Sequence, residues 1–225
     1  MTNAKKKTTK RRSGKPRTLA EQAYAKIKDR LISATYTPGR FLQESEICAD
    51  TKLGRTPVHQ ALHRLHQEGM LEIIARKGIL ISADSLSEIM VALEARALVE
   101  SYCAGQCALR ASEAEFAELR ALLDKYVAVR ESADKATLMD IDRQFHARIG
   151  EIAGNSLLVD FLRPIHERMS RIWFLPHWQF QDFNMTEGEH ERLFSALCSR
   201  DAAGASTAMT GHIESLKRRI TRAQT

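Results

Sequence analysis

The sequence contains no hydrophobic run of membrane-spanning length, and its basic N-terminus lacks the apolar segment of a signal peptide. Membrane and secreted classes are therefore disfavoured, and we expect a soluble, cytoplasmic protein without a membrane partner. The four cysteines form no Cys-x-x-Cys pair and no disulfide framework, so buried reduced thiols are the default expectation. No internal repeat is present.

Acidic residues are absent from the first 17 positions, which carry eight lysines and arginines. The 34 basic residues of the chain less these eight leave 26 against 28 acidic ones, so the net charge of +6 comes from this arm. Low hydrophobicity and like-charge repulsion predict that residues 1–17 are disordered. On DNA such cations would displace condensed counterions, although a solubilising tail or a cloning remnant would have the same composition.

The remainder is long enough for two modest domains, with 44% hydrophobic residues to form two cores. Strand signals are confined to the first part, and long amphipathic helices dominate from Ser85 onward. We therefore expect a mainly α protein, with a winged helix-turn-helix over residues 18–83 and an all-α helical bundle over residues 84–225.

Residues 54–71, GRTPVHQALHRLHQEGML, are the most informative segment. Apolar residues recur at helical spacing, and hydrogen-bonding side chains occupy the other positions, so one face can pack while the other contacts DNA. Thr56 is expected as the N-cap with Pro57 at the first helical position, and Gly69 should end the helix.

The flanking sequence completes the winged helix-turn-helix pattern. A first helix is indicated between Leu19 and Leu31, a turn at 37–39 and a short second helix at 44–51. Residues 71–81 read as strand, turn and strand, which predicts a small β-hairpin wing.

These residues resemble the GntR family of bacterial transcription regulators. The matching positions are Tyr24, Ile27, Pro38, Gly39, Leu42, Glu44, Arg55, Thr56, Pro57, Val58, Ala61, Leu62, Arg64, Leu65, Glu68, Gly69, Lys77 and Gly78. The chain departs from the family pattern at Thr51, Lys52 and Gly54. His59 and Gln60 stand where arginine and glutamate are usual, so we expect an operator that differs from the common one.

The resemblance implies a homodimer on a double-stranded DNA operator, with two heads on half-sites about one helical turn apart. The DNA-facing residues would be Ser45, Arg55, Thr56, His59, Lys77 and Gly78. His59, His63 and His66 share one helix face and could in principle bind a metal, but a role facing solvent or DNA is favoured.

The second domain is expected to hold about six helices. Ser85 and Glu88 form a capping box, Ser112 and Asp134 open two further helices, and Gly154–Asn155 end the second of these. The remaining helices are expected at 156–175, 187–200 and 202–222, with a capping box from Thr186 to Glu189.

Four polar residues of this bundle occupy apolar helix faces. Asp142 and His146 are four residues apart on one stripe, and His190 and His212 lie on the stripes of two later helices. Burying each alone would be costly, whereas one divalent cation would satisfy all four. Alternatively, each histidine could bond a backbone carbonyl, and Asp142 could simply bond His146.

The four positions together resemble the metal-binding set of the FCD domain, the helical effector domain of FadR-like GntR regulators. By this likeness a divalent transition metal of the Zn, Ni or Mn type would sit in the bundle and bind a small carboxylate effector. Arg96 is the first candidate for an effector contact, although it could equally pair with Glu100 at the surface. Arg171, Trp173 and Trp178 could line the pocket, but we expect them to pack around the irregular segment 176–178. His166 and His177 are expected to be structural or exposed.

The expected mechanism is therefore allosteric, with the effector controlling operator affinity and no catalysis. A metal-dependent hydrolase with an accessory DNA-binding head is the main alternative, because a metal with three histidines and one carboxylate could activate water. Two further alternatives are a regulator whose metal is only structural and an architectural DNA-coating protein.

Overall fold

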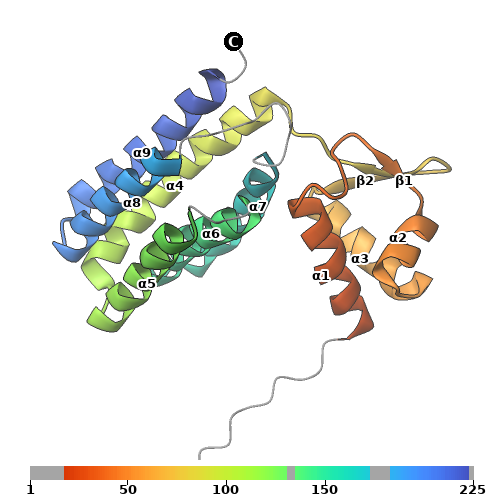
Figure 1. Cartoon of the computed structure of the whole chain (residues 1–225), viewed down its shortest axis with the longest axis horizontal. Helices are drawn as coiled ribbons and strands as arrows, with labels where there is room; N and C mark the ends of the chain where they lie inside the picture. The colour runs from red at the N-terminus through yellow and green to blue at the C-terminus, as the bar shows by residue number, and fades with distance from the viewer. Residues whose placement is uncertain (1–17, 131–134, 173–182, 223–225) are drawn as a thin grey trace, which may run out of the picture.

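The computed structural model describes residues 18–130, 135–172 and 183–222. The expected basic arm lies outside this range, as do Trp173, His177 and Trp178, and the side chain of Arg171 is also outside it. The described part contains a small head and a larger helical bundle (Figure 1).

The head contains three helices and a three-stranded antiparallel sheet with strand order β1-β3-β2. Its core is formed by buried side chains such as Ile27, Leu62 and Leu71. The elements are α1 (Leu19–Ile32), β1 (Phe41–Leu42), α2 (Glu44–Thr51), α3 (Arg55–Gln67), β2 (Leu71–Ile74) and β3 (Gly78–Ile81). The expected winged helix-turn-helix is confirmed, with one added strand, because the two residues of β1 were too short to give a sequence signal.

The start of α3 differs from the expectation. Gly54 is the N-cap, so Thr56 lies inside the first turn and is not the cap that the sequence suggested. Pro57 still falls in that turn, where its missing N–H leaves no intrahelical bond unmade. At the other end Gly69 has a φ of +71°, as expected for the residue after a helix C-cap.

The bundle contains six helices in the described part of the chain. They are α4 (Leu86–Arg110), α5 (Glu113–Arg130), α6 (Lys135–Ile152), α7 (Ser156–Ile172), α8 (Phe183–Cys198) and α9 (Ala202–Arg222). Ser85 and Glu88 cap α4 reciprocally, as predicted. The helix expected at 187 begins earlier, at Phe183, so Thr186 is not its cap.

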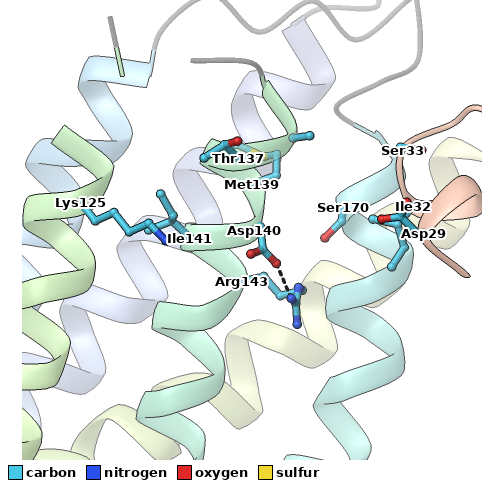
Figure 2. A pocket seen from close by; sticks show the side chains of 11 residues that line it. Asp29, Ile32, Ser33, Lys125, Thr137, Met139, Asp140, Ile141, Arg143 and Ser170 are labelled. Atoms are coloured by element: carbon cyan, nitrogen blue, oxygen red, sulfur yellow. Dashed lines mark hydrogen bonds and ion pairs between the residues drawn. The ribbon is translucent and has the colours of Figure 1, made fainter. Parts of the chain in front are cut away.

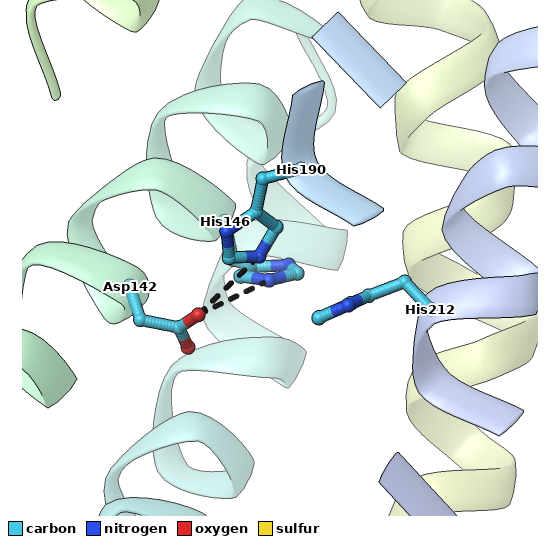
Figure 3. A group of neighbouring side chains, drawn as sticks. All are labelled: Asp142, His146, His190 and His212. Carbon is cyan, nitrogen blue, oxygen red and sulfur yellow. Dashed lines mark ion pairs between the residues drawn. The ribbon is translucent and has the colours of Figure 1, made fainter. Parts of the chain in front are cut away.

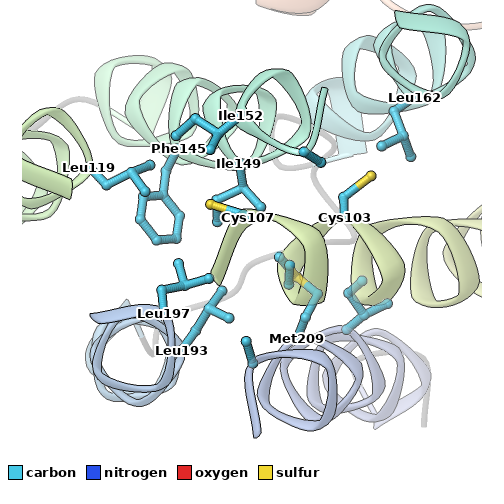
Figure 4. Close-up of a cluster of buried hydrophobic side chains, with 14 of the residues drawn as sticks. Cys103, Cys107, Leu119, Phe145, Ile149, Ile152, Leu162, Leu193, Leu197 and Met209 are labelled. Atoms are coloured by element: carbon cyan, nitrogen blue, oxygen red, sulfur yellow. The ribbon is translucent and has the colours of Figure 1, made fainter. Parts of the chain in front are cut away.

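The two longest helices, α4 and α9, lie side by side, and the other helices pack around them (Figure 1). Figure 4 shows the apolar core of the bundle, to which α4 to α9 all contribute side chains, with Cys103 and Cys107 among the aliphatic side chains. Burial raises the pKa of these thiols to about 11 and about 12, which keeps them protonated. Cys198 is exposed, contrary to the expectation of buried thiols.

Helix α1 of the head lies against α7 of the bundle. Lys28 on α1 forms an ion pair with Glu167 on α7, with Nζ 2.7 Å from Oε2. Beside this contact, between α1, α5, α6 and α7, is a pocket of about 360 Å³ (Figure 2). No helix in the described ranges is both long and apolar enough to cross a membrane.

Gly78 at the start of β3 is the glycine with the tightest backbone surroundings in the wing. Its φ is +112°, and an added Cβ would lie 2.7 Å from the backbone oxygen of Leu42. We predict that Gly78→Ala lowers the free energy of unfolding by roughly 1–3 kcal/mol in denaturant titrations. Alanine would be strained at this positive φ, and its Cβ would clash with a backbone oxygen that cannot move aside as a side chain could.

Gly39→Ala is the matched control for this measurement. Gly39 also has a positive φ, +80°, but open space around it, so the same substitution should cost only about 1 kcal/mol. Equal losses for the two variants would contradict the steric argument.

Candidate metal centre

Three helices bring Asp142, His146, His190 and His212 together in the bundle (Figure 3). Asp142 and His146 come from α6, His190 from α8 and His212 from α9. One donor atom from each residue lies within 4.8 Å of the others. The four residues selected from helical spacing are therefore neighbours in space.

The histidines of this cluster are deeply buried, and the aspartate is less so. His146, His190 and His212 are 2%, 1% and 4% exposed, whereas the side chain of Asp142 is 23% exposed. Asp142 Oδ1 lies 3.3 Å from His190 Nε2 and 4.0 Å from His146 Nε2. One carboxylate oxygen thus faces two imidazoles from the more open side.

Two glutamates orient two of the rings from behind. His146 Nδ1 lies 2.5 Å from Glu100 Oε2, and His212 Nδ1 lies 2.8 Å from Glu189 Oε2. An ionised carboxylate can only accept a hydrogen bond, so the Nδ1 atom facing it must carry the proton. These contacts therefore favour Nδ1–H tautomers and leave each Nε2 with a free lone pair. This is the arrangement in which outer carboxylates hold metal-binding histidines.

Glu100 is the centre of a wider buried network. Besides His146, it accepts hydrogen bonds from Arg96 Nε at 2.5 Å and His166 Nε2 at 2.9 Å. Burial opposes ionisation of Glu100, but Arg96, His166 and His146 together lower its pKa well below the ordinary range. The carboxylate is therefore charged.

Two sequence expectations concern this network. Arg96 does pair with Glu100 at i+4, but the pair is buried and not at the surface. Of the structural and exposed roles expected for His166, the structure shows the first, since the ring is buried and hydrogen-bonded to Glu100. His166 lies four residues after Leu162 and three before Met169, both buried, so the apolar stripe of α7 places it inward and could have revealed this position.

The residues fit a divalent transition metal. His146 Nε2 and both ring nitrogens of His190 are buried without a hydrogen-bond partner, which is costly unless another group satisfies them. Three imidazole nitrogens and one carboxylate oxygen suit several first-row ions, including Zn²⁺, Ni²⁺ and Mn²⁺. Burial lowers the pKa of His190 and His212, with the positive neighbours adding to the effect at His190, so both rings are held in the neutral form that metals require.

Two small cavities flank the cluster, each about 20 Å³ in volume. Both are lined by Arg96, Met139 and Asp142, one toward α7 and the other toward α9. Arg96 uses Nε for Glu100, and its other two nitrogens have no partner among the described residues. Arg96 can therefore offer hydrogen bonds to a ligand beside Asp142.

Family models divide the chain between two known domains. The model described as "Bacterial regulatory proteins, gntR family" matches residues 19–81, and that of the "FCD domain" matches residues 91–215. The chain belongs to the GntR family and carries an FCD domain. The resemblance seen in the sequence is thus confirmed.

Full-length relatives support the same assignment. The Uxu operon transcriptional regulator of Escherichia coli is 29% identical over 230 residues, covering 92% of this chain and 90% of that protein. The structure of E. coli McbR/YncC matches the fold with a TM-score of 0.83 at 17% identity, covering 93% of this chain and all of the other. A metal-free FCD domain of TM0439 matches with a TM-score of 0.51 at 21% identity, covering 64% of this chain and 98% of that one.

The relatives are named as transcriptional regulators, so this GntR protein is a DNA-binding regulator and not an enzyme. The hydrolase alternative drawn from the metal ligands has no support among them.

The six DNA-contact candidates occupy two neighbouring parts of the head. Arg55, Thr56 and His59 are exposed on the first turns of α3, and Ser45 is exposed on α2. Lys77 and Gly78 lie at the wing turn, where the side chain of Gln43 donates to the Lys77 carbonyl. His59 contacts Glu44 at 3.4 Å and His63 at 3.1 Å, so the helix face already carries a polar cluster.

Sequence reasoning missed Glu100 and Glu189 as partners of the candidate ligands. Glu100 lies on α4, and Glu189 directly precedes His190 on α8. A glutamate on a long helix is usually solvated, and no local pattern distinguished these two. The spacing Arg96-x-x-x-Glu100 was visible, but only as a surface pair.

The buried histidines predict a pH effect on the metal-free protein. His166, His190 and His212 have lowered pKa values, primarily because burial disfavours their charged forms, whereas unfolded histidine protonates near 6.5. Below that pH the unfolded chain binds more protons, so stability falls on acidification by about 1.4 kcal/mol per pH unit for each ring that stays neutral. Glu100 and Glu189, with lowered pKa values, add a further loss only below about 4.5.

Denaturant unfolding in chelator between pH 7 and 5 measures this effect. His190→Gln should reduce the slope of the unfolding free energy against pH by about 1.4 kcal/mol per pH unit, the contribution of one proton. His63→Gln, which removes an exposed imidazole, should leave this slope unchanged. A His190→Gln slope equal to that of the wild type would show that the buried ring is protonated in the folded protein.

Proposed function

We propose that this protein is a GntR-family regulator whose operator affinity is controlled by a small organic acid bound at a metal centre in its FCD domain. The ligands of the metal are Asp142, His146, His190 and His212. Arg96 provides the cationic contact for the effector carboxylate. The protein acts as a homodimer on a double-stranded operator.

The observation that carries this proposal is the convergence of three buried imidazoles and one carboxylate backed by Glu100 and Glu189. A purely structural polar cluster would satisfy its own hydrogen bonds, whereas here nitrogens of His146 and His190 are left without partners. When bound, the metal would supply a Lewis-acidic position for a carboxylate oxygen.

Arg96 makes an acid the favoured class of ligand. Its buried guanidinium is neutralised by Glu100 through Nε, and it lines both cavities beside Asp142. A carboxylate could place one oxygen at the centre and the other on the free guanidinium nitrogens. An amine or a neutral apolar ligand would find no matching partner there.

The head supplies the other half of the function. Arg55, Thr56 and His59 on the first turns of α3 would enter the major groove, with Ser45 and the wing residues Lys77 and Gly78 contacting the backbone. An effector that binds one arrangement of the two heads more tightly would shift operator affinity by that difference.

We predict that Arg55→Ala weakens operator binding by roughly 5- to 150-fold, the equivalent of losing one arginine contact of about 1–3 kcal/mol. The measurement is an electrophoretic shift with a DNA fragment selected from random sequence by the wild-type protein. Arg163→Ala, which removes an exposed arginine of α7, is the control and should bind as the wild type does. Unchanged affinity for Arg55→Ala would remove this residue from the interface.

Metal binding is tested by titrating the chelator-treated protein with Zn²⁺ or Ni²⁺ in a calorimeter. We predict one ion per chain, with more than about 100-fold weaker binding for His190→Ala and about 10- to 100-fold weaker binding for Glu189→Gln, which removes only an outer partner. His63→Ala should bind normally. Equal affinity across all variants would disprove the centre.

The same titration distinguishes a regulatory centre from a structural one. With metal bound, a panel of organic acids should contain at least one that raises the melting temperature and alters operator affinity. A metal-loaded protein that binds the operator tightly and responds to none would favour the structural alternative.

A further inference from the structure

Three consecutive residues of α7 contact three different parts of the molecule. His166 reaches the polar network of the bundle core, Glu167 reaches the head, and Arg168 reaches Asp84 in the segment between β3 and α4. One turn of one helix therefore joins the candidate metal centre, the DNA-binding head and the connection between them.

On the bundle side the contacts are short and buried. His166 Nε2 donates to Glu100 at 2.9 Å, and Glu100 in turn holds His146, a proposed ligand, at 2.5 Å. The rings of His166 and His146 are also direct neighbours, with centroids 6.0 Å apart in an edge-to-face arrangement. Because Glu100 is 1% exposed and hydrogen-bonded to both rings, a shift in either ring must be matched by Glu100.

On the head side the ion pair between Lys28 and Glu167 is mostly removed from solvent, with side chains 14% and 12% exposed. Lys28 Nζ also lies 3.2 Å from Glu68 and 2.5 Å from the hydroxyl of Tyr24. Tyr24 donates to Glu68 at 2.8 Å. The cation is thus shared between one carboxylate of the bundle and one of the head.

Glu68 connects this site to the DNA-facing helix. It is the C-cap residue of α3, and Arg64 of the same helix both donates to it and lies over the Tyr24 ring. A change in the position of Lys28 therefore acts on the end of the helix whose first turns carry Arg55, Thr56 and His59.

Two cavities beside the centre would bring a bound ligand into contact with α7. The smaller one, about 20 Å³ or about one water molecule, is walled by His166, Met169 and Ser170 of α7, and a larger one of about 200 Å³ is lined by His146, His166 and Glu167. A ligand larger than water that bound beside Asp142 would press on the wall formed by α7. Since Glu167 and Arg168 lie on the same turn, their contacts with the head and with Asp84 would shift as well.

We propose that α7 couples occupancy of the metal centre to the orientation of the DNA-binding head through the ion pair between Glu167 and Lys28. This inference rests on the proposed function, because it assigns the contacts through which occupancy of the proposed centre would affect the DNA-binding head. Lys28 has two competing carboxylates, Glu167 and Glu68, and the balance between them sets how firmly α1 and α3 are held to the bundle.

The test uses the full chain, Zn²⁺ alone as the probe, and two variants on α7. Glu167→Ala removes the carboxylate that reaches the head but leaves Lys28 paired with Glu68, so the head should still fold. Asp160→Ala, the matched control, removes a carboxylate from the same helix whose partner among the described residues is the exposed Arg163. Zn²⁺ affinity and amide hydrogen exchange with and without Zn²⁺ are measured for each protein.

In the wild type and in Asp160→Ala, Zn²⁺ should slow exchange at least about fivefold in α7 and also in α1 and the end of α3. In Glu167→Ala the slowing in α7 should remain, the slowing in α1 and α3 should be lost, and Zn²⁺ affinity should stay within about threefold of the wild type.

Three results would overturn the coupling. A Glu167→Ala head that responds as in the wild type would exclude this ion pair as the route. A wild-type protein that binds Zn²⁺ and protects α7 but not α1 would refute the coupling while leaving the metal centre intact. Failure of Zn²⁺ to bind the wild type would overturn the proposed centre and the coupling together.

Discussion

Glu100 is the side chain on which the polar interior of the bundle depends. It is 1% exposed and charged, and it is held there because Arg96, His146 and His166 each donate to it. Removing any one donor would leave a buried carboxylate undercompensated, which is among the costlier changes a core can suffer. The ring of His146 is consequently fixed in one tautomer and one direction, and the open geometry beside Asp142 follows from that.

Local chemistry predicted the elements of the fold well. Reciprocal caps at Ser85, helical spacing in α3 and α6, and Gly69 after α3 are signals within a few residues of each other, and the structure confirms them. The four proposed ligands were also found from spacing, because a polar residue on an apolar stripe has to point inward. Thr56 failed as a cap because Gly54, without a side-chain acceptor, is where the backbone turns into the helix.

The rest could not be predicted because its partners are distant in sequence. Glu100 contacts residues 46 and 66 positions later, and nothing around it marks a buried acid. Lys28 and Glu167 belong to different domains, and each by itself reads as an ordinary solvated charge on a helix. Such contacts depend on the angles at which helices cross and on how the head packs against the bundle. The periodicity of a single helix carries no information about either.

The cavities around the candidate centre place a bound ligand against α7. The two spaces beside Asp142 are about 20 Å³ each, and a larger cavity of about 200 Å³ is lined by His146, His166 and Glu167. A ligand larger than water that bound beside Asp142 would move the side chains of the surrounding wall, so its binding would be linked to a change of packing. Because α7 forms part of that wall and also contacts α1, the same displacement that admits a ligand would act on the head.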